Sequence, residues 1–184
     1  SFSGVTYSGL TDGESFVLTA DDVAGTGSEL PVVISGSIAS EVIATRLVFA
    51  EQPPAAATIA TGFSRGVVVQ AQDAGGILDT DVVETVALSS VLGSDHSTLA
   101  AGTLSSSDVG GLSKTLTSGA ASWDNLVYDR SETVALRVTS PSFPAGGDQE
   151  GYSRTVNVGS FDQDGTLVAA SGVSEPVNLP TTVL

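Results

Sequence analysis

Short runs of β-branched and apolar residues, separated by turns rich in glycine and aspartate, recur along almost the whole chain. Such turns include Thr11–Gly13, Asp73–Gly76 and Asp108–Gly111. Val, Ile and Thr favour extended backbone, whereas Gly and Asp favour turns. Many short strands between such turns predict antiparallel sheets packed face to face. The strands that this pattern predicts are Phe16–Ala20, Pro31–Ser35, Arg46–Ala50, Arg65–Ala71, Glu84–Ser89, Gly102–Ser105, Leu112–Thr117, Ala120–Trp123, Thr133–Thr139 and Ser153–Val158.

Several of these runs alternate between apolar and polar residues. In Thr133–Thr139, the side chains of Val134, Leu136 and Val138 fall on one face of the strand. Hydrophobic residues make up 41% of the chain but aromatic residues only 5%, so we expect a core made mainly of Val, Leu, Ile and Ala. No segment carries an apolar stripe of helical period longer than two turns. The chain is therefore predicted to be all-β.

The charge of the chain excludes several partners. Its formal net charge is −15, so it would repel nucleic acids and anionic membrane surfaces. The longest apolar runs, such as Gly66–Val69, are too short to be inserted across a membrane. The chain has no cysteine and no methionine, which rules out disulfides and suits exposure to oxidants. We expect an extracellular or cell-surface location and an acidic surface that is solvated or holds divalent cations.

The sequence also resembles itself at an offset of about 120 residues. Four matches occur in the same order, which indicates a tandem repeat. The matched segments are Val5–Leu10 with Ala121–Leu126, Glu14–Leu18 with Glu132–Leu136, Gly36–Ile38 with Gly159–Phe161, and Leu47–Ala50 with Leu167–Ala170.

This repeat predicts the domain organisation. Residues 1–45 are expected to be the C-terminal strands of a preceding repeat, or a segment that donates strands to a neighbour. Residues 46–158 form one complete unit, and residues 159–184 are a linker and the start of a following repeat. The competing interpretation is one compact unit of 184 residues, in which residues 1–45 pair with the rest.

Five ordered motifs carry a resemblance to a known family. They are Arg46–Pro54 with its Gln-Pro, Val67–Gly76, Thr85–Leu88, Gly102–Ser105, and Gly119–Leu126 with Trp123 in an aromatic position. Together they resemble the bacterial immunoglobulin-like (Big-type) tandem repeat over residues 46–140. The resemblance implies an antiparallel immunoglobulin-like β-sandwich, here one complete unit with flanking partial units. It also implies a parent protein that is large, bacterial, and secreted or anchored at the cell surface.

The sequence offers no constellation for catalysis. His96 is flanked by Asp95 and Ser97, but neighbouring residues in an extended chain point to opposite faces, so they do not form a triad. We expect His96 to be exposed in a loop. Paired carboxylates such as Asp79 and Asp81 lack the aromatic platform of a sugar-cleaving site. The chain is predicted not to be an enzyme, and Trp123 is expected in the core.

Calcium is the one cofactor for which the sequence offers candidate ligands. Asp162 and Asp164 stand at alternate positions before a glycine, as in the first half of a calcium loop, and they fall at the expected junction between repeats. The alternative is an ordinary Asp-Gly turn. A second candidate calcium site comprises Asp73, Asp79 and Asp81.

Three functions are compatible with these observations. The first is a non-catalytic structural repeat, a spacer or fibre-forming module of an adhesin, sheath or stalk, whose partners are neighbouring repeats or copies of the same protein. The second is a binding module for a carbohydrate or protein at the cell surface, acting through loops Ser90–Ser97 and Ser142–Gly151. The third is a self-assembling filament subunit in which residues 1–45 complete a neighbour's sheet by strand exchange.

Overall fold

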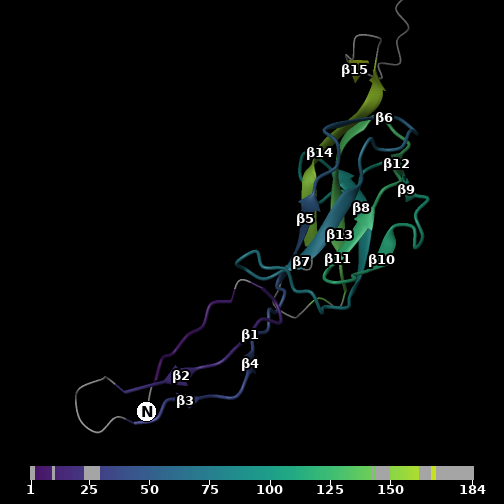
Figure 1. The fold of residues 1–184 in the computed structure, drawn as a ribbon. Coiled ribbons are helices and arrows are strands. Elements are labelled where there is room, and N and C mark those ends of the chain that lie inside the picture. Colours follow the sequence, from purple (N-terminus) through teal and green to yellow (C-terminus); the bar gives the residue numbers. More distant parts are fainter. Residues whose placement is uncertain are drawn as a thin grey trace, which may run out of the picture.

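The computed structural model describes residues 3–9, 11–22, 30–141, 143, 150–161 and 167–168. These residues form strands and turns with no helix among them, so the prediction of an all-β chain is confirmed. They fall into an arm, the described residues between 3 and 40, a connector, residues 41–45, and a body, the described residues from 46 to 168 (Figure 1). This part of the chain accordingly has no long apolar helix that could cross a membrane.

The arm is a long antiparallel hairpin made of two short ladders. β1 (Ser15–Phe16) pairs with β4 (Ile38–Ala39), and β2 (Thr19–Ala20) pairs with β3 (Val33–Ile34). Residues 3–9 run beside this hairpin, and the ring of Tyr7 stacks on that of Phe16 with 3.9 Å between centroids. Among the described strands, none of the arm pairs with any of the body.

The larger sheet of the body contains its longest strands. Its order is β10-β8-β13-β14-β15, and β6 joins the outer side of β14 in the parallel direction. All other pairs in this sheet are antiparallel. The bounds of its strands are β6 Ala56–Thr58, β8 Thr85–Leu92, β10 Ser113–Thr115, β13 Glu132–Thr139, β14 Glu150–Phe161 and β15 Leu167–Val168.

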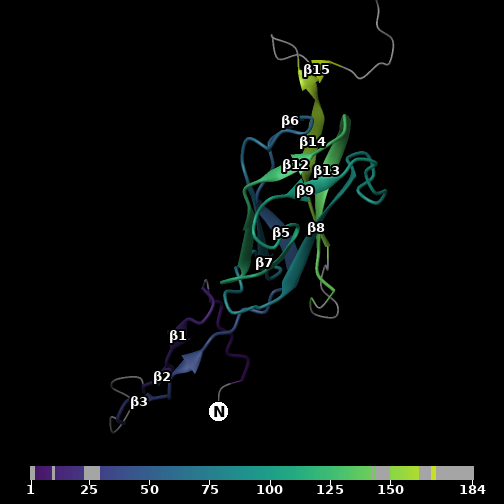
Figure 2. The same ribbon diagram turned by 90° about the vertical axis from the view of Figure 1, so that its right-hand side faces the viewer.

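A second antiparallel sheet of order β11-β7-β5 faces the first, and a short pair β12-β9 extends this layer (Figure 2). The sequence pattern predicts most of these strands. It does not predict β4, β6, β12 or β15, because segments of two or three residues carry too little alternation. The bounds in this layer are β5 Arg46–Glu51, β7 Val67–Gln72, β9 Leu104–Ser106, β11 Ala120–Trp123 and β12 Leu126–Tyr128.

The core lies between the two layers of the body and is filled as the alternation predicts. Val134, Leu136 and Val138 of β13 are fully buried, and so are Val67 and Val69 of β7 on the opposite layer. Burial of each such aliphatic side chain stabilises the fold by about 1.5–3 kcal/mol. The expectation that the Trp123 side chain is buried is confirmed, since none of its surface is exposed.

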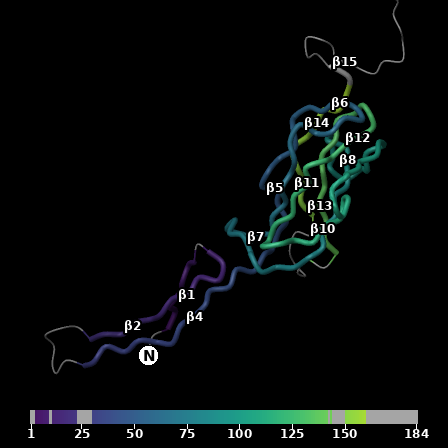
Figure 3. The backbone as a smooth tube through the Cα atoms, turned by 45° about the vertical axis from the view of Figure 1, so that its right-hand side comes forward, coloured from purple at the N-terminus to yellow at the C-terminus, as the bar shows by residue number. Residues whose placement is uncertain are grey.

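The arm and the last strands of the body lie at opposite ends of the molecule. The arm extends from the end where β5 begins, whereas β14 leads to β15 at the far end (Figures 1 and 3). The chain therefore enters the body at one end and leaves it at the other.

Candidate functional site

The sequence-predicted calcium ligands Asp162 and Asp164 lie outside the described residues. The second candidate, formed by Asp73, Asp79 and Asp81, is only partly assembled. Asp79 and Asp81 do come together, but their third partner is Asp12 of the arm, with one oxygen of each carboxylate within 4.8 Å of the others. Asp73 instead caps its own turn, where its Oδ1 accepts a hydrogen bond from Ile77 N at 2.8 Å.

This carboxylate cluster surrounds the segment that connects the arm to the body. The connector, residues 41–45, runs directly from β4 into β5. The turn Thr11–Gly13 approaches it from the arm, and Asp79 approaches it from the loop that follows the bridge between Gln72 and Leu78. The cluster therefore joins three segments that are far apart in sequence.

Asp79 is the buried member of the cluster, with 5% of its surface exposed. Its Oδ2 accepts a hydrogen bond from Ala44 N at 2.8 Å, and its Oδ1 accepts one from Val82 N at 3.0 Å. Gly119 packs against the same residue, since a Cβ there would lie 2.0 Å from the Asp79 carbonyl oxygen. Only glycine fits this close approach, and its φ of +73° also favours glycine.

Asp12 fastens the arm to both the connector and the body. Its Oδ1 accepts a hydrogen bond from Val42 N at 3.0 Å. Its Oδ2 accepts two from Thr80, one from the backbone N at 2.8 Å and one from Oγ1 at 2.7 Å. These bonds, with that from the Thr80 hydroxyl the largest contribution, lower the pKa of Asp12, so the carboxylate form is favoured.

The pKa values of two exposed carboxyls at this junction, those of Asp81 and Glu41, are shifted in the opposite direction. A hydrogen bond between the carboxyls of Asp81 and Asp79, with partial desolvation and repulsion from Asp12, raises the pKa of Asp81. Repulsion from Asp81 is likewise the largest of the effects that raise the pKa of Glu41 at the start of the connector. The cluster thus concentrates negative charge at the junction.

Carboxylate oxygens are ligands that suit Ca²⁺, which takes six to eight of them. The three-aspartate cluster offers six oxygens, but both oxygens of Asp12 and both of Asp79 already accept hydrogen bonds. What the geometry shows directly is a clamp: the backbone N–H groups of Val42 and Ala44 are held by these two carboxylates, and that of Thr45 by Gln72 O at 2.8 Å. Sequence reasoning missed Asp12, which it treated only as a turn former.

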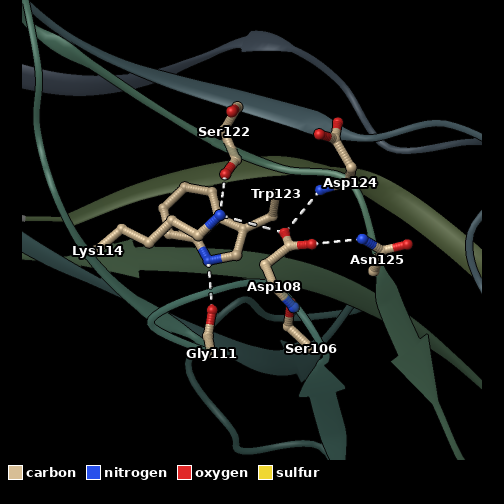
Figure 4. A network of polar contacts seen from close by, with 8 residues as sticks. All are labelled: Ser106, Asp108, Gly111, Lys114, Ser122, Trp123, Asp124 and Asn125. Carbon is tan, nitrogen blue, oxygen red and sulfur yellow. Dashed lines mark hydrogen bonds and ion pairs between the residues drawn. The ribbon is translucent and has the colours of Figure 1, made fainter.

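A second polar network closes the end of β9 against the β11–β12 turn (Figure 4). The Asp108 carboxylate accepts hydrogen bonds from Asn125 Nδ2 at 2.6 Å, Asp124 N at 2.8 Å and Lys114 Nζ at 3.2 Å. The hydrogen bond from Asn125 is the largest of the effects that lower the pKa of Asp108 to about 2.

The same network holds the lysine and the tryptophan in place. The Lys114 ammonium also donates to Ser122 O and lies 5.4 Å from the centre of the Trp123 ring, where the ring face attracts a cation. The indole Nε1 donates to Gly111 O at 3.0 Å. A depression of about 410 Å³ beside Lys114 is lined mainly by Val, Thr, Ala and Ser residues. The ammonium is thus engaged with Asp108 and Ser122, and the network fastens loops to strands.

His96 lies in a loop, as expected, but the expectation that it is exposed is wrong. The ring is half-buried and stacks on Tyr152, with 5.3 Å between centroids, because the loop folds back onto β14. Asp95 does not orient the imidazole. Its Oδ1 accepts hydrogen bonds from Ser97 N and Thr98 N, each at 3.0 Å, and these bonds hold the loop itself.

Comparison with known proteins adds no family assignment. No family model matches the chain, and no curated protein matches it. For the binding-module alternative, most of the predicted loop 142–151 lies outside the described residues.

Proposed function

We propose that the chain is a non-catalytic structural repeat, an immunoglobulin-like β-sandwich that serves as a spacer in an extracellular bacterial surface protein. The observation that carries the proposal is the clamped connector between the arm and a body that the chain enters and leaves at opposite ends (Figure 1). A module of this kind sets the distance and the orientation between its neighbours in the parent protein, and those neighbours are its partners.

The connector is short, and the carboxylates hold it on two sides. Val42 and Ala44 are themselves buried, with 9% and 2% of their surface exposed, so the segment combines packing with hydrogen bonds. A linker without such bonds behaves as a flexible hinge. The clamp thus supports a stiff connection, which a spacer requires and an independent binding module does not.

The acidic composition supports the same function. A net charge of −15 keeps neighbouring rods apart and soluble. The family resemblance over residues 46–140 supports a tandem arrangement and an extracellular location.

The stiffness of the connector tests this proposal. Because the chain has no cysteine, spin labels can be attached at Ser37→Cys in the arm and Ser64→Cys in the body. We expect one narrow distribution of distances between the labels in pulsed electron paramagnetic resonance. Asp12→Ala should broaden it, because the Val42 and Thr80 donors lose their acceptor.

Asp21→Ala is the matched control. It removes the same charge from the arm, but among the described residues the Asp21 carboxylate accepts a hydrogen bond only from the adjacent Asp22 N. Its distance distribution should equal that of the doubly labelled chain without an alanine substitution. A broad distribution in that labelled chain would contradict the spacer function.

A further inference from the structure

The arm hairpin and the last hairpin of the body have the same register. Adding 118 to the residue numbers of each arm pair gives a pair of β13–β14: Ser15 and Ala39, for example, become Thr133 and Asn157. All four pairs of the arm obey this rule. They are Ser15–Ala39, Phe16–Ile38, Thr19–Ile34 and Ala20–Val33, which correspond to Thr133–Asn157, Val134–Val156, Arg137–Tyr152 and Val138–Gly151.

The irregularity of the hairpin is repeated as well. From Phe16 to Thr19 the first strand advances by three residues, whereas its partner strand changes by four, from Ile38 to Ile34. The body hairpin shows the same difference between Val134 and Arg137. An extra residue of this kind is a β-bulge, which sets the twist and the register of a hairpin.

One serine holds the bulge in each copy. Leu18 N donates to Ser35 Oγ at 2.9 Å, and Leu136 N donates to Ser153 Oγ at 2.9 Å. Both serine hydroxyls then donate to the carbonyl oxygen of the next residue at 2.7 Å. Leu18 and Ser35 become Leu136 and Ser153 on addition of the same 118. The strand register and the serine hydrogen bonds therefore give the same correspondence independently.

The two hairpins differ in what covers them. Leu136 and Val156 of the body are fully buried, but their counterparts Leu18 and Ile38 are 48% and 37% exposed. A hollow of about 670 Å³ lies beside Leu18, and the rest of its lining is Val5, Thr19, Ala20, Asp21, Val33 and Ser35. Around Leu18 and Ile38, the face that is core in the body is therefore exposed in the arm, whereas the Tyr7 ring covers Phe16, the counterpart of Val134.

One edge of the arm hairpin is uncovered too. In the body, β13 lies between β14 and β8, and Leu136 stands opposite Ser90. In the described part of the arm, β1 and β2 pair only with β4 and β3. Leu18 O accepts from Ser35 N, so by alternation Val17 and Thr19 turn their backbone polar groups to the outer edge. Such a row is a template for a further strand.

We propose that the arm is the C-terminal hairpin of a second unit of the body type, and that its outer edge and apolar face bind a β8-type strand and the facing sheet of that unit. Charge favours such an occupant. The sequence has no basic residue before Arg46, and Thr85–Leu92, the model for the incoming strand, has no charged residue that the acidic arm would repel. This inference rests on the proposed structural repeat and names the neighbour with which the repeat assembles.

The test extends the full chain. Residues 46–118 are placed directly before Ser3, because the match of Val5 with Ala121 makes Ser3 the counterpart of Gly119, and they supply the strands of the second unit that precede the arm. Amide hydrogen exchange is then compared with that of the unextended chain. We expect exchange at Val17 and Thr19 to slow by about 100-fold or more, because edge amides become part of a cooperatively folded sheet.

Two variants of the extended chain make the assignment specific. Leu18→Asp places a charge at the position of fully buried Leu136 and should abolish the protection. Thr19→Asp adds the same charge at the position of partly exposed Arg137 and should retain it. Unchanged exchange in the arm of the extended chain, or added residues that stay unprotected, would overturn the proposal. Equal loss in both variants would do the same.

The docking inference and the proposed function are tested by different measurements, so the failure of one can be told from the failure of the other. The distance measurement reports the connector, and the exchange measurement reports the outer edge of β1 and β2. A stiff connector with an unprotected arm would refute only the docking inference.

Discussion

Replacement of Asp79 by alanine isolates the contribution of the clamp to stability. The substitution removes the acceptor of two backbone donors, Ala44 N and Val82 N, in a site where the side chain is 95% buried. A buried donor left without a partner costs about 1–3 kcal/mol, so the free energy of unfolding should fall by about 2–6 kcal/mol for the two donors. The bonds are charge-assisted, which places the expected loss toward the upper part of that interval.

Urea unfolding followed by tryptophan fluorescence measures this loss, since Trp123 is the single tryptophan and lies in the core. The midpoint should move while the slope stays constant, because the surface exposed on unfolding does not change. Asp81→Asn is the matched control. It removes a neighbouring negative charge that raises the free energy of the folded state, so it should leave the protein equally or slightly more stable. Equal destabilisation by both substitutions would refute the assignment of the clamp to Asp79.

Three further predictions concern other parts of the molecule. The pKa of Asp108, about 2 in the folded protein against an ordinary 3.8, means that its contribution to stability is complete above pH 3.8 and disappears toward pH 2; acid unfolding of Asp108→Asn should lack this component. Ser153→Ala should cost about 1–3 kcal/mol in urea unfolding, because buried Leu136 N loses its acceptor. Calcium at Asp162 and Asp164 remains a prediction: the melting temperature should rise with added calcium and fall with chelator, and Asp162→Asn should remove the difference, whereas an unchanged value would discard the site.

The body could be predicted well because its signal is local. Alternation in Thr133–Thr139 assigns Val134, Leu136 and Val138 to the core, and period 2 leaves no other face for them. Trp123 followed from its place in a motif series. A short element such as β6 could not be predicted, because three residues show no periodicity and β6 is a strand only by its pairing with β14, which is distant in sequence.

The junction could not be predicted, since its partners are distant in sequence. Asp12 and Thr80 meet only when the arm docks on the body, and nothing near Asp12 distinguishes it from any aspartate in a turn. The likeness between the arm hairpin and the last hairpin of the body was partly visible in the sequence. Glu14–Leu18 was matched at the offset that the register shows, but Gly36–Ile38 was matched five residues too far, because Ile38 occupies the position of Val156. Gly-Ser pairs are too common to fix an alignment by themselves.

The parallel pairing of β6 with β14 has a mechanical consequence. Asn157 N donates to Ala55 O at 2.9 Å, Ile59 N donates to Gly159 O at 3.2 Å, and Arg154 N donates to Gln52 Oε1 at 2.8 Å. The first strands of the body and its last long strand point the same way, so tension applied at the two ends slides them past each other. These bonds then bear the load together instead of opening one by one, and the rate of forced unfolding is governed by that barrier. In the proposed spacer, this seam would therefore carry the tension that passes through the body.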